Sequence, residues 1–566
     1  MTFARFRAKA GPDLLLPALL ALSVVRLWLM PLRSSFWIDE MGTVFVARHG
    51  AADPSLAVAP QVAVSIYYWL PRAAQALFGS SEVVYRLPSV LAMAIAVALV
   101  ARLAARLIHP RAGWFAAFAC LAISGIDYQA ADARPYALGT CVAAAGVLFL
   151  VRWLDVARWR DGVLFALFAG LLWRVHLVFW PFYLVFAGYA VARLAYRRPE
   201  GSGMPDLYGA ETRAGWLRTA AVFGLAGLTL LPVLAGALAL FRDAKAHVIV
   251  KPPSLHELEH SLRWNVVVLC AAGAWILSRF RPGVGRTPKT GAGAREPGAG
   301  ARKFLLGLGL ASWYTAVRVR MPTQASAPAR VREPPGPWPL APGPCISGTS
   351  WALFLAWWLC QPVGLFAFSW LTGNSVFVRR YLFLMLPGAA LTATAAAARF
   401  TPPARMNRLA ALLAVAGLLA LGNWGQRWPP HEHSDWRGAA RKIDELALGP
   451  DTPVICPSPF IEARPPVWRP DYRLPGFLYA HLPVYPIGGT AYLFPFETSP
   501  EAERYATDLT RDALSTSRRF LIYGGNGATR FWRKWFAARP ELAGWRSVRL
   551  PYGDVDVVQF DAGPGK

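Results

Sequence analysis

Long apolar runs are the feature of this sequence that most limits the folds open to it. Residues 12–32, 83–108, 136–154, 217–240 and 350–371 are runs of spanning length, about twenty residues each. Only 16% of the 566 residues are charged, against roughly a quarter in a typical soluble protein. The sequence therefore predicts an α-helical polytopic membrane protein.

We expect about eleven spans in total, of which the third and fifth are short. They lie near 12–32, 83–108, 113–126, 136–154, 162–173, 175–195, 217–240, 264–280, 350–371, 380–398 and 408–423. The first run follows Arg5, Arg7 and Lys9 without a small-residue cleavage site, so we read it as an uncleaved helix.

The net charge of +26 is explained by topology rather than by nucleic-acid binding. Basic residues concentrate in alternate loops, as the positive-inside rule describes. That rule places the N-terminus on the cytoplasmic side of the membrane and, with eleven spans, the C-terminus on the periplasmic or equivalent outer side. The loop at about 33–82 then also faces outward.

Two segments differ from the transmembrane part at 1–423. Residues 279–349 form an irregular, Gly/Pro/Arg-rich cytoplasmic insertion, whose apolar run at 303–317 we do not count as a span. Residues 424–566 predict a soluble, extracytoplasmic α/β domain. Its expected strands are TPVIC (452–456), RRFLIYGG (518–525) and VDVVQF (555–560), and its expected helices are DWRGAARKIDELAL (435–448) and SPEAERYATDLTRDAL (499–514).

The first outer loop carries the adjacent carboxylates Asp39 and Glu40 just past the first span. A carboxylate here could act as a general base toward an acceptor hydroxyl. The alternative is a solvated acidic turn under an interfacial aromatic belt, which residue chemistry alone favours.

Two further outer elements carry charge. In the second outer loop, Arg134 could bind a phosphate, and Asp132 could orient Arg134 or assist the base. Residue chemistry alone favours a plain Asp–Arg pair that helps to set the loop. Arg379 and Arg380 lie at the outer mouth of a span, where they either bind a lipid phosphate or extend toward headgroups. Arg174 and His176, in a short outer turn, are weaker candidates.

These pieces, in this order, resemble polytopic glycosyltransferases of the GT-C fold, in a family 39/83-like group. That group includes protein O-mannosyltransferases, lipid A aminoarabinose transferases and lipopolysaccharide galacturonosyltransferase-like proteins. The motifs that carry the resemblance are FWIDE (36–40), LFGSSEVVYRLPSVL (77–91), DARPYAL (132–138), RRYLFLMLPG (379–388) and DWRGAARKI (435–443).

The resemblance implies a glycosyltransferase that uses a polyprenyl-phosphate sugar donor at the outer membrane face, with a lipid, glycan or protein acceptor of the cell envelope. It implies catalytic roles for Asp39 and Glu40 and contacts to the donor phosphate from Arg134, Arg379, Arg380 and Tyr381. Supporting roles fall to Arg86, Asp132 and Tyr136.

The chain departs from the family at APQVAVSIYYWLP (59–71), where many relatives have a His-containing segment. We therefore assign no metal ligand and leave divalent-metal dependence open. Two other functions fit the sequence: a transporter or flippase for lipid-linked glycans, and a non-catalytic envelope assembly protein. A transporter would be expected to show ionisable residues at mid-membrane depth and internal repeats, and neither is clear.

Overall fold

The computed structural model describes residues 14–59, 62, 65–195, 212–242, 251–279, 346–470 and 476–563. Contacts divide the chain into two compact units, one formed by 1–275 with 343–566 and the other by 276–342. Apart from its ends, the predicted insertion at 279–349 lies outside the described residues, and so does its apolar run at 303–317.

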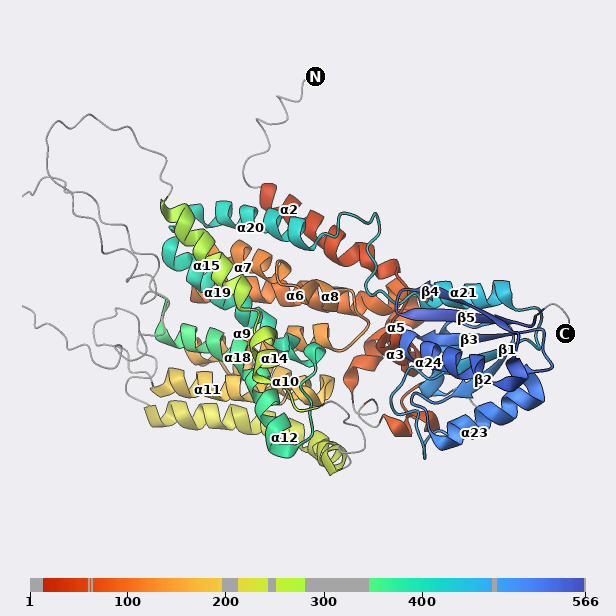
Figure 1. Ribbon diagram of the computed structural model, residues 1–566. Helices are drawn as coiled ribbons and strands as arrows, with labels where there is room; N and C mark the ends of the chain where they lie inside the picture. The colour runs from red at the N-terminus through yellow and green to blue at the C-terminus, as the bar shows by residue number, and fades with distance from the viewer. Residues whose placement is uncertain are drawn as a thin grey trace, which may run out of the picture. The chain divides into compact units, whose positions relative to one another are not determined.

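Helices make up most of the first unit (Figure 1). The longer ones are α2 (Leu15–Val24), α6 (Glu82–Leu107), α7 (Ala112–Leu121), α9 (Tyr136–Val156), α10 (Trp159–Val175), α11 (Phe182–Ala195), α12 (Thr212–Arg242), α15 (Trp264–Arg279), α18 (Gly348–Thr372), α19 (Leu386–Phe400) and α20 (Met406–Leu421). Shorter helical pieces include η1 (Val25–Leu29), η2 (Met30–Arg33), α3 (Ile38–His49), η4 (Ile66–Tyr68), α5 (Trp69–Phe78), α8 (Ile126–Ala130), η5 (Leu177–Phe179), α14 (Leu255–Ser261) and η6 (Arg379–Met385).

Eight helical segments of the described chain are long and apolar enough to cross a membrane. The pair α14 and α15, bent by 46°, would add a ninth if it forms one span. The predicted spans 113–126 and 162–173 correspond to α7 and α10, which have 10 and 17 residues. The polytopic helical fold is thus confirmed, while the number of eleven spans stays a prediction.

Arg26, near the end of the first predicted span, joins this span to the last one. Its guanidinium donates to the backbone oxygens of Gly422 (2.6 Å), Asn423 (2.6 Å), Gln426 (2.8 Å) and Arg427 (3.1 Å). The last carbonyls of a helix have no partner within it, so this arginine satisfies the end of α20 and the turn that follows. It also fixes where residues after 421 leave the helices.

The C-terminal residues form a five-stranded sheet, as the predicted α/β fold requires. Its order is β2 (Thr490–Phe494), β1 (Pro453–Pro457), β3 (Arg519–Gly525), β5 (Val555–Asp561) and β4 (Arg546–Tyr552). β1 runs parallel to both β2 and β3, and β5 runs antiparallel to β3 and β4. The three predicted strands are β1, β3 and β5.

Helices cover both faces of this sheet. Successive residues of a strand point to opposite faces. In β3, Phe520 packs against Phe536 of α24 (Asn526–Ala537), with ring centroids 5.5 Å apart. Tyr523 points to the other face and packs against Trp436 of α21 (Trp436–Leu446), at 5.4 Å. The two predicted helices are α21 and α23 (Pro500–Leu509), the latter continued by a π turn at Thr510–Leu514.

The described hydrophobic core has two clusters. One joins the side chains of the long helices. The other joins the sheet and its helices to α3, through Met41, Val44 and Phe45 among others. Because α3 shares the core of the sheet, the domain boundary expected at 423/424 stays a prediction.

Candidate active site

The start of α3 separates the two adjacent carboxylates of the first outer loop. Asp39 and Glu40 occupy the first turn, where a helix N-terminus favours negative charge. Neighbouring residues of a helix point about 100° apart. The Asp39 side chain is therefore 18% exposed, whereas that of Glu40 is completely buried.

Glu40 forms a buried ion pair with Arg86 of α6. Arg86 Nε donates to Glu40 Oε1 (2.7 Å) and Nη2 donates to Oε2. Arg86 also donates to the backbone oxygens of Leu32 (2.9 Å), Ser34 (2.8 Å) and Ser35 (3.1 Å). Burial alone would raise the pKa of Glu40, but the charge and hydrogen bonds of Arg86 outweigh it and hold that pKa below its usual value. The pair fixes the turn between the first span and α3.

Asp39 faces two arginines from distant parts of the chain. Its Oδ2 lies 3.0 Å from Arg380 Nη1 and 3.7 Å from Arg134 Nη2. Arg134 Nη1 also donates to the Asp39 backbone oxygen at 3.1 Å. Three of the predicted site residues are thus brought together: one carboxylate and two permanent cations.

These residues line a pocket of about 160 Å³. Its wall comes from α3, from the segment before α5, from the second outer loop, from the turn after α10, from η6 and from the C-terminal region. The lining residues are Asp39, Gly42, Ala59, Val62, Ser65, Tyr68, Arg134, Pro135, Trp173, Arg174, Val175, His176, Leu177, Arg380, Tyr381, Phe460, Glu462 and Phe477. The pocket is mixed in character, with aromatic walls around a charged centre.

The 3-10 helix η6 presents two of its first three residues to the pocket. Arg380 lies over the rings of Trp37 (5.8 Å) and Tyr381 (5.6 Å), and Gln361 Nε2 donates to the Tyr381 backbone oxygen at 3.1 Å. Arg379 is exposed and is not among the pocket residues in the described part of the chain. Tyr136 is buried beside the pocket, with Arg134 over its ring at 5.8 Å.

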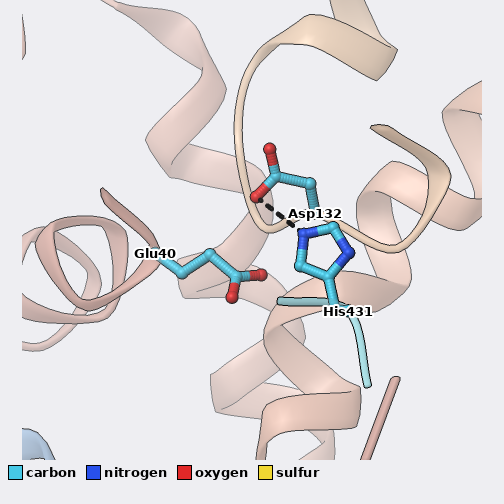
Figure 2. Close-up of side chains that lie close together, drawn as sticks. All are labelled: Glu40, Asp132 and His431. Atoms are coloured by element: carbon cyan, nitrogen blue, oxygen red, sulfur yellow. Dashed lines mark ion pairs between the residues drawn. The ribbon is translucent and has the colours of Figure 1, made fainter. Parts of the chain in front are cut away.

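Asp132 is buried behind the pocket rather than in its wall. Its Oδ1 accepts from Trp37 Nε1 (3.1 Å) and lies 3.7 Å from His431 Nε2. Figure 2 shows this pairing, with Glu40 directed toward the same centre. Burial raises the pKa of Asp132, and the nearby His431 offsets this in part. Since Trp37 lies against Arg380, Asp132 helps to place that arginine through the indole.

Glu40, Asp132 and His431 have the composition of a metal site, because one ligand atom from each lies within 4.8 Å of the others. The oxygens of Glu40 are already occupied, however. Oε1 accepts from Arg86 Nε and from Ala133 N (2.8 Å), and Oε2 accepts from Arg86 Nη2 and from Trp37 N (3.3 Å). A divalent cation would also lie beside the Arg86 charge, so this donor set suits an ion-pair network better than a metal.

Residues 65–210 match the model of a family described as dolichyl-phosphate-mannose-protein mannosyltransferase. The chain is similar to lipid-linked-sugar glycosyltransferases. The matched region carries Arg86, Asp132, Arg134 and Tyr136, and the match confirms the resemblance that the motifs indicated.

Two solved structures are also similar over nearly the whole chain. One is ArnT from Cupriavidus metallidurans bound to undecaprenyl phosphate, with 12% identity, a TM-score of 0.48, and 97% of this chain and 98% of that chain covered. The other is the same protein in the apo state, with 14% identity, a TM-score of 0.35 and the same coverage. At these identities and TM-scores the two structures assign no role to any residue here. No curated protein matches the chain.

Sequence reasoning did not single out His431 or Tyr68, and it treated Arg174 and His176 as weaker candidates. Arg174 and His176 line the pocket. Their position in a predicted outer turn is consistent with this. His431 is 299 positions beyond Asp132 in the chain, and no spacing rule connects them. Tyr68 stands in the segment where the expected histidine is missing.

Proposed function

We propose that this protein is a membrane glycosyltransferase that moves a sugar from a polyprenyl-phosphate donor to an acceptor of the cell envelope. The observation that carries the proposal is Asp39 between Arg134 and Arg380 in a pocket bordered by membrane helices. Displacement of a phosphate from an anomeric carbon needs a base for the acceptor and positive charge for the leaving group. The family match at 65–210 supports the same reaction class.

The mechanism is a single displacement. The acceptor hydroxyl or amine attacks the anomeric carbon, and the bond from that carbon to the phosphate oxygen breaks. The electron pair leaves with the polyprenyl phosphate, and the acceptor proton passes to Asp39. In the donor complex the phosphate becomes the counter-ion of Arg134 and Arg380, which frees the Asp39 carboxylate to act as the base.

Of the remaining predicted site residues, we assign some to contacts with the donor and others to holding the pocket residues in place. Tyr381 lines the pocket beside Arg380 and contacts the donor phosphate region. Arg86 and Glu40 hold the start of α3, so we assign Glu40 a positioning role rather than a catalytic one. Asp132 and Tyr136 support Trp37 and Arg134. Arg379 is exposed and is not a lining residue of the described pocket, so we assign it to lipid headgroups rather than to the donor phosphate.

We further propose that the pocket opens at the outer face of a bacterial inner membrane, with the N-terminus cytoplasmic. The excess of Lys and Arg in the loops assigned to the cytoplasm supports this orientation. The acceptor is then a lipid, glycan or protein on the periplasmic side.

The test is Asp39→Asn in the purified, detergent-solubilised protein. We expect the wild type to release polyprenyl phosphate from a pool of polyprenyl-phosphate sugars, and the variant to fold normally but lose at least 100-fold in turnover, because general-base catalysis contributes roughly 10²–10⁴-fold. Asp508→Asn, in the exposed part of α23, is the matched control and keeps wild-type turnover.

If the wild type binds lipid-linked sugar without consuming it, the transferase proposal fails and a transporter becomes the better account. If Asp39→Asn turns over donor as fast as the wild type, the base assignment fails.

A further inference from the structure

Tyr68 is held in the pocket wall by the segment that precedes α5. Ser65 begins the 3-10 turn η4: its hydroxyl accepts from Tyr67 N (3.3 Å) and donates to the Val175 backbone oxygen at the end of α10 (2.8 Å). These bonds tie residues 65–68 to the turn that supplies the opposite pocket residues. Tyr68 then lines the pocket, whereas its neighbour Tyr67 is completely buried and is not a lining residue in the described chain.

The hydroxyl of Tyr68 lies among the groups proposed to act on the donor. Tyr68 lines the same pocket as Asp39, Arg134 and Tyr381, and these three residues are its electrostatic neighbours. Burial raises the pKa of this phenol above its usual value of about 10, which the charge of Arg134 offsets only in part. The hydroxyl therefore keeps its proton near neutral pH and can donate it in a hydrogen bond.

A bound phosphate would leave room for such a donor. Each phosphate oxygen accepts more than one hydrogen bond, and one N–H of Arg134 is already committed to the Asp39 backbone oxygen. A neutral donor beside two arginines adds a directional bond without adding charge.

We propose that Tyr68 is a donor-contacting residue whose hydroxyl donates a hydrogen bond to the phosphate held by Arg134 and Arg380. This inference rests on the proposed function, because the phosphate is that of the polyprenyl donor. Tyr68 lies in the segment 59–71, where this sequence lacks the histidine that many relatives have.

The test compares Tyr68→Phe with Tyr67→Phe, which remove the same hydroxyl from adjacent positions. Binding of undecaprenyl phosphate and of undecaprenol to the full-length, detergent-solubilised protein is measured by native mass spectrometry, with melting temperatures recorded in parallel. We expect Tyr68→Phe to bind undecaprenyl phosphate about 10- to 100-fold more weakly, as for a lost hydrogen bond to a charged group. Undecaprenol binding stays unchanged, and Tyr67→Phe stays within about twofold of wild type for both lipids.

Three results would overturn the inference. Tyr68→Phe could bind undecaprenyl phosphate as well as the wild type does. It could lose undecaprenol to the same extent, or Tyr67→Phe could weaken binding equally; either result would mark a packing effect. If instead the wild type prefers undecaprenol or binds neither lipid, the donor class of the proposed function is wrong as well. Arg380→Gln, which should weaken phosphate binding alone, separates these cases.

Discussion

The buried pair of Glu40 and Arg86 places one full positive and one full negative charge out of contact with water. Both side chains are completely buried, and removing ions from water costs several kcal/mol each. The cost is offset here because the pair is bidentate and the backbone oxygens of residues 32, 34 and 35 accept the remaining guanidinium protons. Such a network specifies one arrangement of the turn that positions Asp39.

Arg86→Met should therefore destabilise the protein strongly, by about 3–5 kcal/mol, because it leaves Glu40 charged and unpaired. The measurement is the midpoint of thermal or denaturant unfolding in detergent. Arg106→Met is the matched control on the same helix, since the pair Arg106–Asp155 is partly exposed and worth about 0–1 kcal/mol. Equal losses in the two variants would contradict the role given to the buried pair.

At this scale, residue chemistry and family resemblance predicted several charged and aromatic residues of the pocket, but not that Glu40 lies outside it. Asp39, Arg134, Arg380 and Tyr381 do line one pocket. The pattern FWIDE cannot show that Glu40 turns inward, because that depends on Arg86, 46 residues away. His431 was beyond reach for the same reason, since only the fold brings it to Asp132.

Among the elements, α22 (His481–Val484) carries a histidine that should make stability depend on pH. His481 is completely buried against Trp436 and Tyr523, and burial lowers its pKa to about 3. The unfolded chain, with a pKa near 6.5, binds a proton over a range where the folded protein does not. Stability is therefore lost as the pH falls below about 6.5, by up to about 1.4 kcal/mol per unit.

His481→Phe should remove this contribution. Between pH 6.5 and 5, the free energy of unfolding of the wild type should fall by roughly 1.6 kcal/mol more than that of the variant. The measurement is the apparent melting temperature of both proteins in matched buffers. Identical pH dependence in the two proteins would show that His481 is not the group responsible.

The elements of the C-terminal sheet show which strands a sequence reveals. The predicted strands β1, β3 and β5 occupy the inside of the sheet and are almost wholly buried, so each reads as an apolar run. The two strands that were missed, β2 and β4, are the edges. Their residues are mostly exposed or half-buried, and β4 contains Pro551, which edge strands tolerate. The edge strands bury less of their surface than the inner ones, so burial constrains their residues less.

In the whole molecule, the C-terminal sheet region and the first outer loop share one hydrophobic core. Phe477 packs against Phe45 of α3, and a methyl group built on Gly42 would lie 3.1 Å from the Phe477 ring. Phe460, Glu462 and Phe477 also line the pocket. The hydropathy change near residue 424 marks where spans end, but it carries no information about which earlier segment the C-terminal region packs on.

In the proposed mechanism, the pocket between Asp39, Arg134 and Arg380 holds the phosphate of a lipid-linked sugar donor. The most direct test is an experimental structure of the full-length protein in lipid nanodiscs with undecaprenyl phosphate. We predict phosphate density within about 3 Å of both guanidinium groups, a hydrogen-bonding distance, with the Asp39 carboxylate released from Arg380. Phosphate bound elsewhere while Asp39 stays paired with Arg380 would contradict the claim.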